Sequence, residues 1–373
     1  MKIFKEIILK IKTTITLARN YLINKLFFNS KIFKFLTKIF KKVAYDGYGS
    51  KECLKEGFLP VPVHYYSPIP DIKDLEKRKV WDKKSKLTGL NFNGKNQLLL
   101  LKKLGQKFGQ ECVWPLKPTA NPTDFFLDNQ SFSYGCAAAL HSMIREFKPR
   151  NIIEIGSGDS SKIINRALAA NQKENNKKVT YTVIDPYPID RVNFLKIDKF
   201  FKKRVELVNP NYFDKLGKND ILFIDSSHSV KIGSDVNYLY LEILPRLKPG
   251  VIVHIHDICL PYEYPKAYAT NEVFRQFWTE QYLLQSFLIF NHDFEILLSM
   301  AYLMTDYLSK FKAAFPVYNS VVHKYISHSF WIRRKINANT SCSNELTKTG
   351  KTGMLASSEA KLKEKTIYFT KGV

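Results

Sequence analysis

Residues 149–160 read Pro-Arg-Asn-Ile-Ile-Glu-Ile-Gly-Ser-Gly-Asp-Ser, and this stretch decides the fold. An apolar run over 151–155 predicts a buried strand, and a helix is predicted over 160–170. The turn between them contains Gly156 and Gly158, which can adopt backbone angles closed to other residues and so pass close to a ligand. The free N–H groups of the helix start point into the same space. Together these features predict an α/β protein with a nucleoside-type ligand at the end of its first strand.

The glycine spacing argues against a dinucleotide-binding site. That fingerprint requires a third glycine at position 161, where this chain has Ser161. Glu154 is unusual as well, because a carboxylate near the end of a buried strand needs a cationic partner or several hydrogen-bond donors. We therefore expect Glu154 to face the ligand together with the turn residues Gly156, Ser157 and Gly158.

Acidic residues follow the other predicted strands. A second strand over 179–184 leads to Asp185, which can accept hydrogen bonds from both hydroxyls of a ribose or, alternatively, cap the following turn. Further strands are predicted at 205–208, 221–224 and 251–255. Asp225 follows the fourth strand, and His256 and Asp257 follow the fifth. Since parallel strands end at the same edge of a sheet, these residues are predicted to line one site.

These motifs, taken in order, resemble those of class I S-adenosylmethionine-dependent methyltransferases. They are Glu-Ile-Gly-Ser-Gly (154–158), Val-Ile-Asp (183–185), Phe-Ile-Asp-Ser-Ser-His (223–228), Leu-Lys-Pro-Gly (247–250) and His-Asp-Ile (256–258). The chain is most similar to the branch with Asp-x-x-His after strand four and His-Asp after strand five. The resemblance covers about residues 140–300 and is weaker upstream, from Tyr65 onward.

The resemblance implies an α/β fold: a mostly parallel, Rossmann-like sheet of seven strands with an antiparallel edge strand, flanked by helices. It implies S-adenosylmethionine as cofactor and methylation of a hydroxyl on a saccharide, a glycolipid or a small molecule. The cofactor-binding residues that it implies are Glu154, Gly156, Ser157, Gly158, Asp185 and Asp225.

Two histidines are candidate general bases for removing the hydroxyl proton. His228 and His256 each lie just past a strand end, and an imidazole titrates near neutral pH. Asp257 could orient either ring. The alternative for each histidine is a structural hydrogen bond within a loop.

A divalent metal is a further possibility at the same edge. Asp225 and Asp257 correspond to carboxylate ligands of metal-dependent small-molecule O-methyltransferases. In that pattern an Asn usually follows the second Asp, and here the residue is Ile258, so His228 would have to substitute. Oxygen ligands of this kind suit Mg²⁺ or Mn²⁺ rather than zinc.

Two other functions compete with this interpretation. The net charge of +24 suggests an RNA or DNA methyltransferase, but the Asn/Asp-Pro-Pro-Tyr/Phe motif of base-amine methylation is missing after the fourth strand. Asn209-Pro-Asn-Tyr212 is similar but follows the third strand, so nucleic acid is an unlikely partner. A catalytically silent membrane-surface protein is the other competitor. The presence of Glu154, both glycines and Asp185 argues against it.

Charge and composition divide the 373 residues into four segments. Residues 1–44 are predicted to form a basic amphipathic helical arm, since residues 1–42 hold eleven Lys or Arg and one acid. Residues 45–140 are interpreted as a cap that selects the substrate, and 141–332 as the methyltransferase domain. Residues 333–373 are rich in Ser, Thr, Asn and Lys, so a disordered basic tail is predicted.

The arm is predicted to contain two helices, the second beginning after Asn29-Ser30. Each has an apolar face opposite a basic one, which suits a helix lying in the interface of an anionic membrane. Arg19 and Lys25 interrupt every apolar window long enough to span a bilayer. Residues 1–43 are therefore expected to bind a membrane surface, with packing on the catalytic domain or on a second subunit as the alternative.

The five cysteines are widely spaced and include no Cys-x-x-Cys pair. This argues against a zinc site or a disulfide framework and suits a reducing compartment. The expected location is cytoplasmic, with peripheral binding to the inner face of the membrane through the arm.

Overall fold

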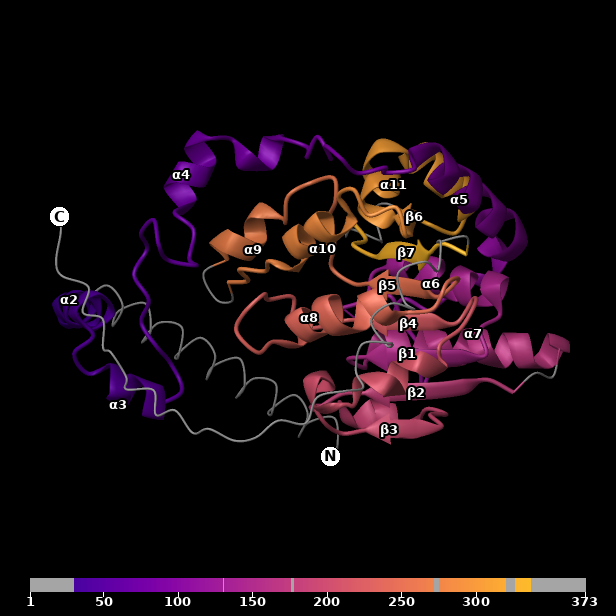
Figure 1. The fold of residues 1–373 in the computed structure, drawn as a ribbon, viewed down its shortest axis with the longest axis horizontal. Coiled ribbons are helices and arrows are strands. Elements are labelled where there is room, and N and C mark those ends of the chain that lie inside the picture. Colours follow the sequence, from indigo (N-terminus) through magenta and orange to yellow (C-terminus); the bar gives the residue numbers. More distant parts are fainter. Residues whose placement is uncertain (1–29, 130, 176–177, 272–274, 320–325, 337–373) are drawn as a thin grey trace, which may run out of the picture.

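A computed structural model of the chain describes residues 30–129, 131–175, 178–271, 275–319 and 326–336 (Figure 1). At its centre lies a sheet of seven strands: β1 (Asn151–Ile155), β2 (Thr180–Ile184), β3 (Lys199–Phe201), β4 (Ile221–Ile224), β5 (Ile252–Ile255), β6 (Phe294–Ser299) and β7 (Phe330–Arg334). Their order is β3-β2-β1-β4-β5-β7-β6. Strands β1 to β5 are parallel, whereas β7 runs antiparallel to both β5 and β6. The predicted seven-stranded, mostly parallel sheet is confirmed.

The central strands are apolar because both of their faces are covered. All four residues of β4 and of β5 are buried, and only Asn151 of β1 is partly exposed. Such continuous apolar runs are typical of parallel strands between two helical layers. The register aligns the carboxyl ends of β1, β2 and β4, with Ile155 opposite both Ile184 and Ile224.

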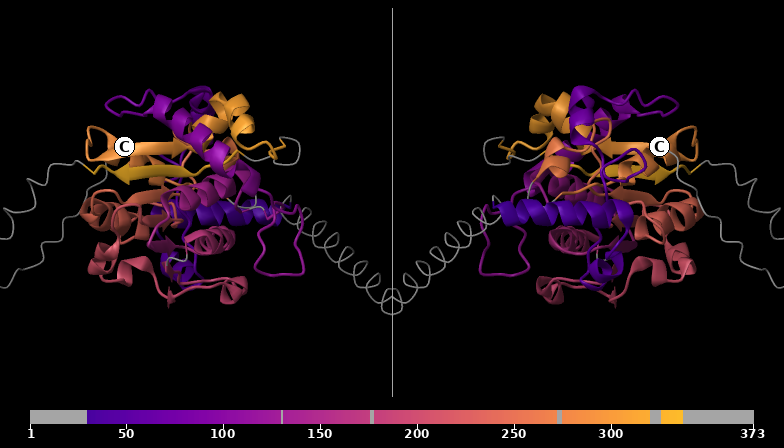
Figure 2. Two further views of the ribbon diagram at one scale, coloured as in Figure 1. Left: turned by 90° about the vertical axis from the view of Figure 1, so that its right-hand side faces the viewer. Right: turned by 90° about the vertical axis from the view of Figure 1, so that its left-hand side faces the viewer.

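Helices cover both faces of the sheet (Figures 1 and 2). One face packs against α5 (Gly94–Phe108), α6 (Tyr134–Phe147), α7 (Asp159–Asn175), α11 (Met300–Asp306) and α12 (Leu308–Ala314). The other face packs against α10 (Glu280–Leu288) and against α8 (Asp235–Tyr238), which continues as π and 3₁₀ turns to Arg246. The shorter helices are α3 (Ser50–Lys55), α4 (Ile72–Lys77) and α9 (Lys266–Thr270).

The structure corrects three expectations. Residues 205–208 do not form the third strand: Val205–Leu207 is a 3₁₀ turn, because Val205 and Val208, three residues apart, both pack into the core. The third strand is instead β3, a short edge strand whose residues are mostly exposed. Helices α5 and α6 share one core with β1, so residues 45–140 are not a separate cap. Arg333 and Arg334 end β7 and do not belong to a tail.

Helix α2 (Lys31–Asp46) confirms the helix predicted after Asn29-Ser30. The Ser30 hydroxyl accepts a hydrogen bond from the Phe33 N–H at 3.1 Å, and Gly47 ends the helix with a left-handed φ of 76°. No residue of α2 is buried. The helix lies apart from the sheet in Figure 1, and the right-hand view of Figure 2 shows it side-on. The helix predicted before it and the tail from 337 lie outside the described residues. Within the described part of the chain, no helix is both long and apolar enough to cross a bilayer.

Candidate active site

A cavity of about 440 Å³ opens at the carboxyl ends of β1, β2 and β4. Of the residues predicted to bind a cofactor, Gly156, Asp185 and Asp225 line it. Tyr187, Val205 and Lys231 are among the other lining residues. The volume falls in the range of small-molecule binding sites, and the position is where open α/β sheets bind ligands.

The two glycines of the turn serve different purposes. Gly156 has a left-handed φ of 74°, and a Cβ at this position would collide with the backbone oxygen of Asp225. Gly158 is not left-handed, and a Cβ there would meet no atom within 4 Å. The expectation of unusual backbone angles is therefore confirmed only at Gly156. At Gly158 the missing side chain leaves open space above the turn, which fits a ligand held close to the backbone.

Asp185 is nearly buried and is held in a fixed orientation. Its Oδ2 accepts hydrogen bonds from the Ser157 N–H at 2.8 Å and the Ser157 hydroxyl at 2.6 Å, while Oδ1 accepts from the Tyr187 N–H at 2.7 Å. Each carboxylate oxygen can accept more than one hydrogen bond, so the group can still receive ribose hydroxyls. Ser157 thus acts by orienting Asp185.

Glu154 does not face the cavity, contrary to expectation. Its side chain is fully buried beneath the first turn of α7, where it accepts hydrogen bonds from the hydroxyls of Ser160 and Ser161 at 2.7 Å each and from that of Tyr181. Burial, opposed by these three hydroxyls, raises the pKa of the carboxyl to about 7. The donors that this carboxylate needs come from the chain itself.

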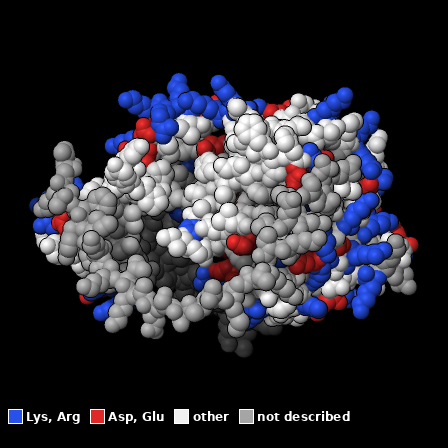
Figure 3. Space-filling view, viewed as in Figure 1, with Lys and Arg blue, Asp and Glu red and all other residues white. Residues whose placement is uncertain are grey.

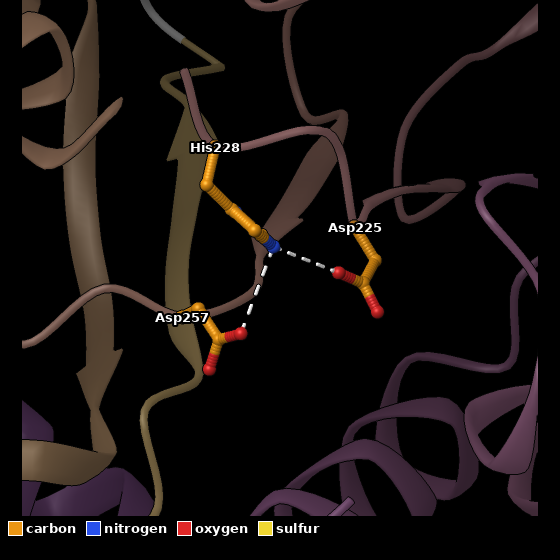
Figure 4. A group of neighbouring side chains, drawn as sticks. All are labelled: Asp225, His228 and Asp257. Carbon is orange, nitrogen blue, oxygen red and sulfur yellow. Dashed lines mark ion pairs between the residues drawn. The ribbon is translucent and has the colours of Figure 1, made fainter. Parts of the chain in front are cut away.

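His228 lies at the centre of a cluster of carboxylates (Figure 4). Its Nε2 is 3.2 Å from Asp225 Oδ1 and 3.6 Å from Asp257 Oδ2, and its Nδ1 is 2.8 Å from Oε2 of the buried Glu280. Burial opposes charge on the ring, but the hydrogen bonds to Asp225 and Glu280 outweigh it and raise the pKa of His228 well above its usual range. Both carboxylates therefore favour the protonated imidazole.

The backbone around the cluster is strained. His228 and Asp257 have left-handed φ angles of 57° and 55°, which cost roughly 1–3 kcal/mol at residues other than glycine. The N–H groups of Thr279 and Glu280 donate to the His228 carbonyl at 2.9 and 3.1 Å and so help to hold this conformation. Such strain is common at functional sites.

His256 occupies a different environment. Its ring stacks on Phe132 with centroids 4.9 Å apart, and its Nδ1 lies 3.3 Å from Nε2 of His254. Its Nε2 is 3.8 Å from Asp257 Oδ1. His256 is buried and does not line the cavity, so its contacts suit orientation of Asp257 better than proton transfer with a bound molecule.

The cluster also has the geometry of a cation site. The ligand atoms of Asp225, His228 and Asp257 lie within 4.8 Å of one another. Ile258 is buried in the core, and His228 supplies the third donor in its place. Glu280 behind His228 is the kind of partner that orients most metal-binding histidines. Two carboxylates and one imidazole therefore fit a divalent ion such as Mn²⁺.

A second cavity of about 220 Å³ lies beside His228. Trp278, one of its walls, has its ring centroid 4.4 Å from that of His228. The other residues that line it are Pro68, Pro70, Leu75, Val80, Trp81, Glu263, Tyr264, Pro265, Tyr268, Ala269, Gln276, Phe277, Thr279 and Tyr282. Neither this wall nor Glu280 was assigned a role from the sequence, although the Phe-Trp-Thr-Glu-Gln-Tyr motif at 277–282 was a signal for both.

Part of the chain matches a known protein family. Residues 153–258 match the family described as "Methyltransferase domain". A protein of Archaeoglobus fulgidus, described as uncharacterized, is 31% identical over 169 residues, which are 43% of this chain and 75% of that protein.

Two solved structures are similar at lower identity. The SAH-bound methyltransferase PaMTH1 of Podospora anserina is 14% identical, covering 53% of this chain and 77% of its own, with a TM-score of 0.30. A protein of Thermobifida fusca, provisionally described as a methyltransferase, is also 14% identical, covering 68% and 96%, with a TM-score of 0.35. Likenesses this low support no conclusion about the activity of this chain.

Proposed function

We propose that this chain, which belongs to the family described as "Methyltransferase domain", transfers a methyl group from S-adenosylmethionine to a hydroxyl group. The position of His228 carries this proposal. Its partner Asp225 lines the larger cavity, and its ring neighbour Trp278 lines the smaller one. A group between two binding cavities can act on a proton at the point where their ligands meet.

The larger cavity fits the nucleoside part of the cofactor. Asp185 would accept the ribose hydroxyls, and Gly158 leaves space next to the backbone. When bound, S-adenosylmethionine supplies a methyl group on a positively charged sulfur. The chain must then bring an acceptor oxygen into line with that methyl group and exclude water.

His228 Nε2 is the atom proposed to take the hydroxyl proton. Because Asp225 and Glu280 favour the charged imidazole, His228 must first lose its own proton to act as a base. Asp257 lies 3.6 Å from the same nitrogen, Nε2. Removal of a general base typically costs ~10²–10⁴ in rate.

A divalent cation is the alternative partner for the same atoms. Asp225, His228 and Asp257 would hold it, and when bound it would supply positive charge to stabilise an acceptor alkoxide. His228 would then be a ligand and not the base. The two roles are separable by experiment.

We further propose that α2 binds an anionic membrane surface and keeps the active site close to its acceptor. Lys31, Lys34, Lys38, Lys41 and Lys42 lie on one face of the helix, opposite Ile32, Leu36 and Ile39. This arrangement supports a helix lying in the interface, with lysines toward the lipid headgroups.

Calorimetry with S-adenosylmethionine tests the proposed activity at its first step. Asp185→Ala is expected to weaken binding by ~1.5–3 kcal/mol, the scale of hydrogen bonds to a charged group. Glu154→Gln is the matched control and should bind nearly as the wild type does, since Glu154 does not line the cavity. A folded wild-type protein that binds no S-adenosylmethionine, or that binds NAD instead, contradicts the proposal.

A further inference from the structure

The smaller cavity has an aromatic wall and few charges. Trp81, Tyr264, Tyr268, Phe277, Trp278 and Tyr282 all line it. The Tyr268 ring lies 4.9 Å from that of Trp278 at 74°, so the two rings form adjoining walls of a corner. Both remain partly exposed. A ligand entering this corner meets apolar ring faces first.

Internal hydrogen bonds turn these rings into a fixed apolar surface. The Trp81 indole N–H donates to the Tyr264 carbonyl at 3.0 Å, and the Tyr264 hydroxyl accepts from the Gln281 N–H at 3.0 Å. The polar ends of both side chains are thereby occupied within the protein. What they offer to a ligand is ring surface.

Residues 68–82, which include α4, form one wall of the cavity. Lys266 pairs with Glu76 of α4 at 2.7 Å, and its ammonium lies 5.6 Å from the Trp81 ring centroid. These contacts fasten α4 and Trp81 onto α9. Residues 68–82 therefore contribute five of the fifteen residues that line the cavity, whereas α5 and α6 belong to the core.

The charge of the lining argues against an anionic ligand. Glu263 is the one ionisable carboxylate among the described lining residues, and no Lys, Arg or His is among them. Its Oε1 accepts hydrogen bonds from the Tyr264 N–H at 2.8 Å and from the Tyr282 hydroxyl at 2.5 Å.

The cations lie elsewhere. Figure 3 shows Lys and Arg gathered on the upper margin of the molecule, over α4, where Lys73, Lys77, Arg78, Lys79 and Lys83 are exposed. The exposed position of these cations leaves Glu263 to set the charge inside the cavity.

We propose that this cavity binds the methyl acceptor and that the bound group is an uncharged pyranose ring of a saccharide. The inference rests on the proposed function and names its substrate class. A pyranose presents an apolar C–H face to the corner of Tyr268 and Trp278 and hydroxyls to Glu263 and Thr279. A phenol would also pack against the rings, but it offers a single hydroxyl to Glu263 and Thr279, whereas a pyranose offers several. Trp278 packs on His228 with ring centroids 4.4 Å apart, so the hydroxyl next to Trp278 is the one nearest to His228.

Saturation-transfer NMR on the full-length protein, loaded with S-adenosylhomocysteine, tests the proposal. The probes are methyl α-D-glucopyranoside, methyl α-D-mannopyranoside and methyl α-L-rhamnopyranoside, with p-cresol and choline as competitors of other classes. At least one pyranoside should receive saturation on its ring C–H protons. Tyr268→Ala and Trp81→Ala should each raise its dissociation constant by ~3- to 10-fold, the value of about one aromatic contact.

Two variants make the result specific. Trp81→Phe keeps a ring and should retain most of the affinity, whereas Phe290→Ala removes an exposed ring outside both cavities and should change nothing. Binding of p-cresol or choline in preference to every pyranoside overturns the proposal, as does equal pyranoside binding by Tyr268→Ala and the wild type. Loss of S-adenosylhomocysteine binding in the wild type is a failure of the proposed function instead, and it is detected in the same samples by calorimetry.

Discussion

The carboxyl edge of the sheet and the segment from α2 to Tyr66 differ in what surrounds their side chains. At the edge, His228 and Glu280 are buried and pair with each other, and Asp225 pairs with His228 as well. From α2 to Tyr66 the apolar side chains face solvent: Ile32 is 65% exposed and Tyr65 93%. Among the described residues, no carboxylate pairs with a lysine of α2. The edge is explained by contacts within the chain, whereas α2 has the character of a surface that binds something else.

The largest effect is expected at the edge. His228→Ala should lower the rate of methyl transfer by ~10²–10⁴ and leave affinity for S-adenosylmethionine nearly unchanged, because the ring does not line the larger cavity. The measurement is release of S-adenosylhomocysteine with the pyranosides as acceptors, or with a deproteinised cell extract if none reacts. His256→Ala is the companion variant. Wild-type rates in both would show that neither histidine is the base.

The buried carboxyl of Glu154 gives the edge of the sheet a stability that depends on pH. The folded chain keeps the Glu154 proton up to about pH 7, whereas the unfolded chain loses it near 4.5. The folded state binds more protons in this window, so stability falls as pH rises from 4.5 to 7 and is level above it. The loss amounts to ~3 kcal/mol.

Urea denaturation at pH 5 and pH 8 measures this effect. Glu154→Gln cannot titrate, so its stability should change between the two pH values by ~2.5 kcal/mol less than that of the wild type. Glu242→Gln, at an exposed glutamate, is the control and should follow the wild type. An equal change in the free energy of unfolding for Glu154→Gln and the wild type would mean that the Glu154 carboxyl has the same pKa in the folded and the unfolded state.

Manganese binding decides between the two roles of His228. If the cluster holds a cation, electron paramagnetic resonance should detect bound Mn²⁺ in the wild type. Glu280→Gln should then weaken the affinity by ~10- to 100-fold, because it removes the group that orients His228. Asp293→Asn, at an exposed acid, should have no effect. Full activity after exhaustive chelation would exclude the cation.

The sequence predicts the edge better than its surroundings for physical reasons. β4 is a continuous apolar run, and β1 and β5 are mostly apolar, each followed by a turn that carries polar residues, so their positions and the meeting of Asp225 with Asp257 follow from the pattern. Glu280 could not be placed, because it is 52 residues from His228 along the chain.

Two further predictions were wrong, one about the direction of a side chain and one about the packing of two helices. Glu154 was assigned to the cavity because a strand pattern does not reveal which face meets the ligand. The segment 45–140 was taken as one unit because the burial of α5 and α6 depends on long-range contacts.

The smallest effect for a single substitution is expected on α2. Lys34→Gln and Lys38→Gln should each weaken binding of the full-length protein to anionic vesicles by ~1 kcal/mol at low salt, with no change in stability, since both lysines are exposed. Ile39→Ser should weaken binding at both low and high salt, because salt screens only the charge attraction. Lys102→Gln, a lysine on α5, is the control. Sedimentation with phosphatidylcholine vesicles and with mixed phosphatidylcholine–phosphatidylserine vesicles separates the two contributions.

If the wild type stays in the supernatant with anionic vesicles at low salt, α2 does not bind membranes. If Ile39→Ser instead converts a dimer to a monomer in analytical ultracentrifugation, its apolar face is covered by a second copy of the chain.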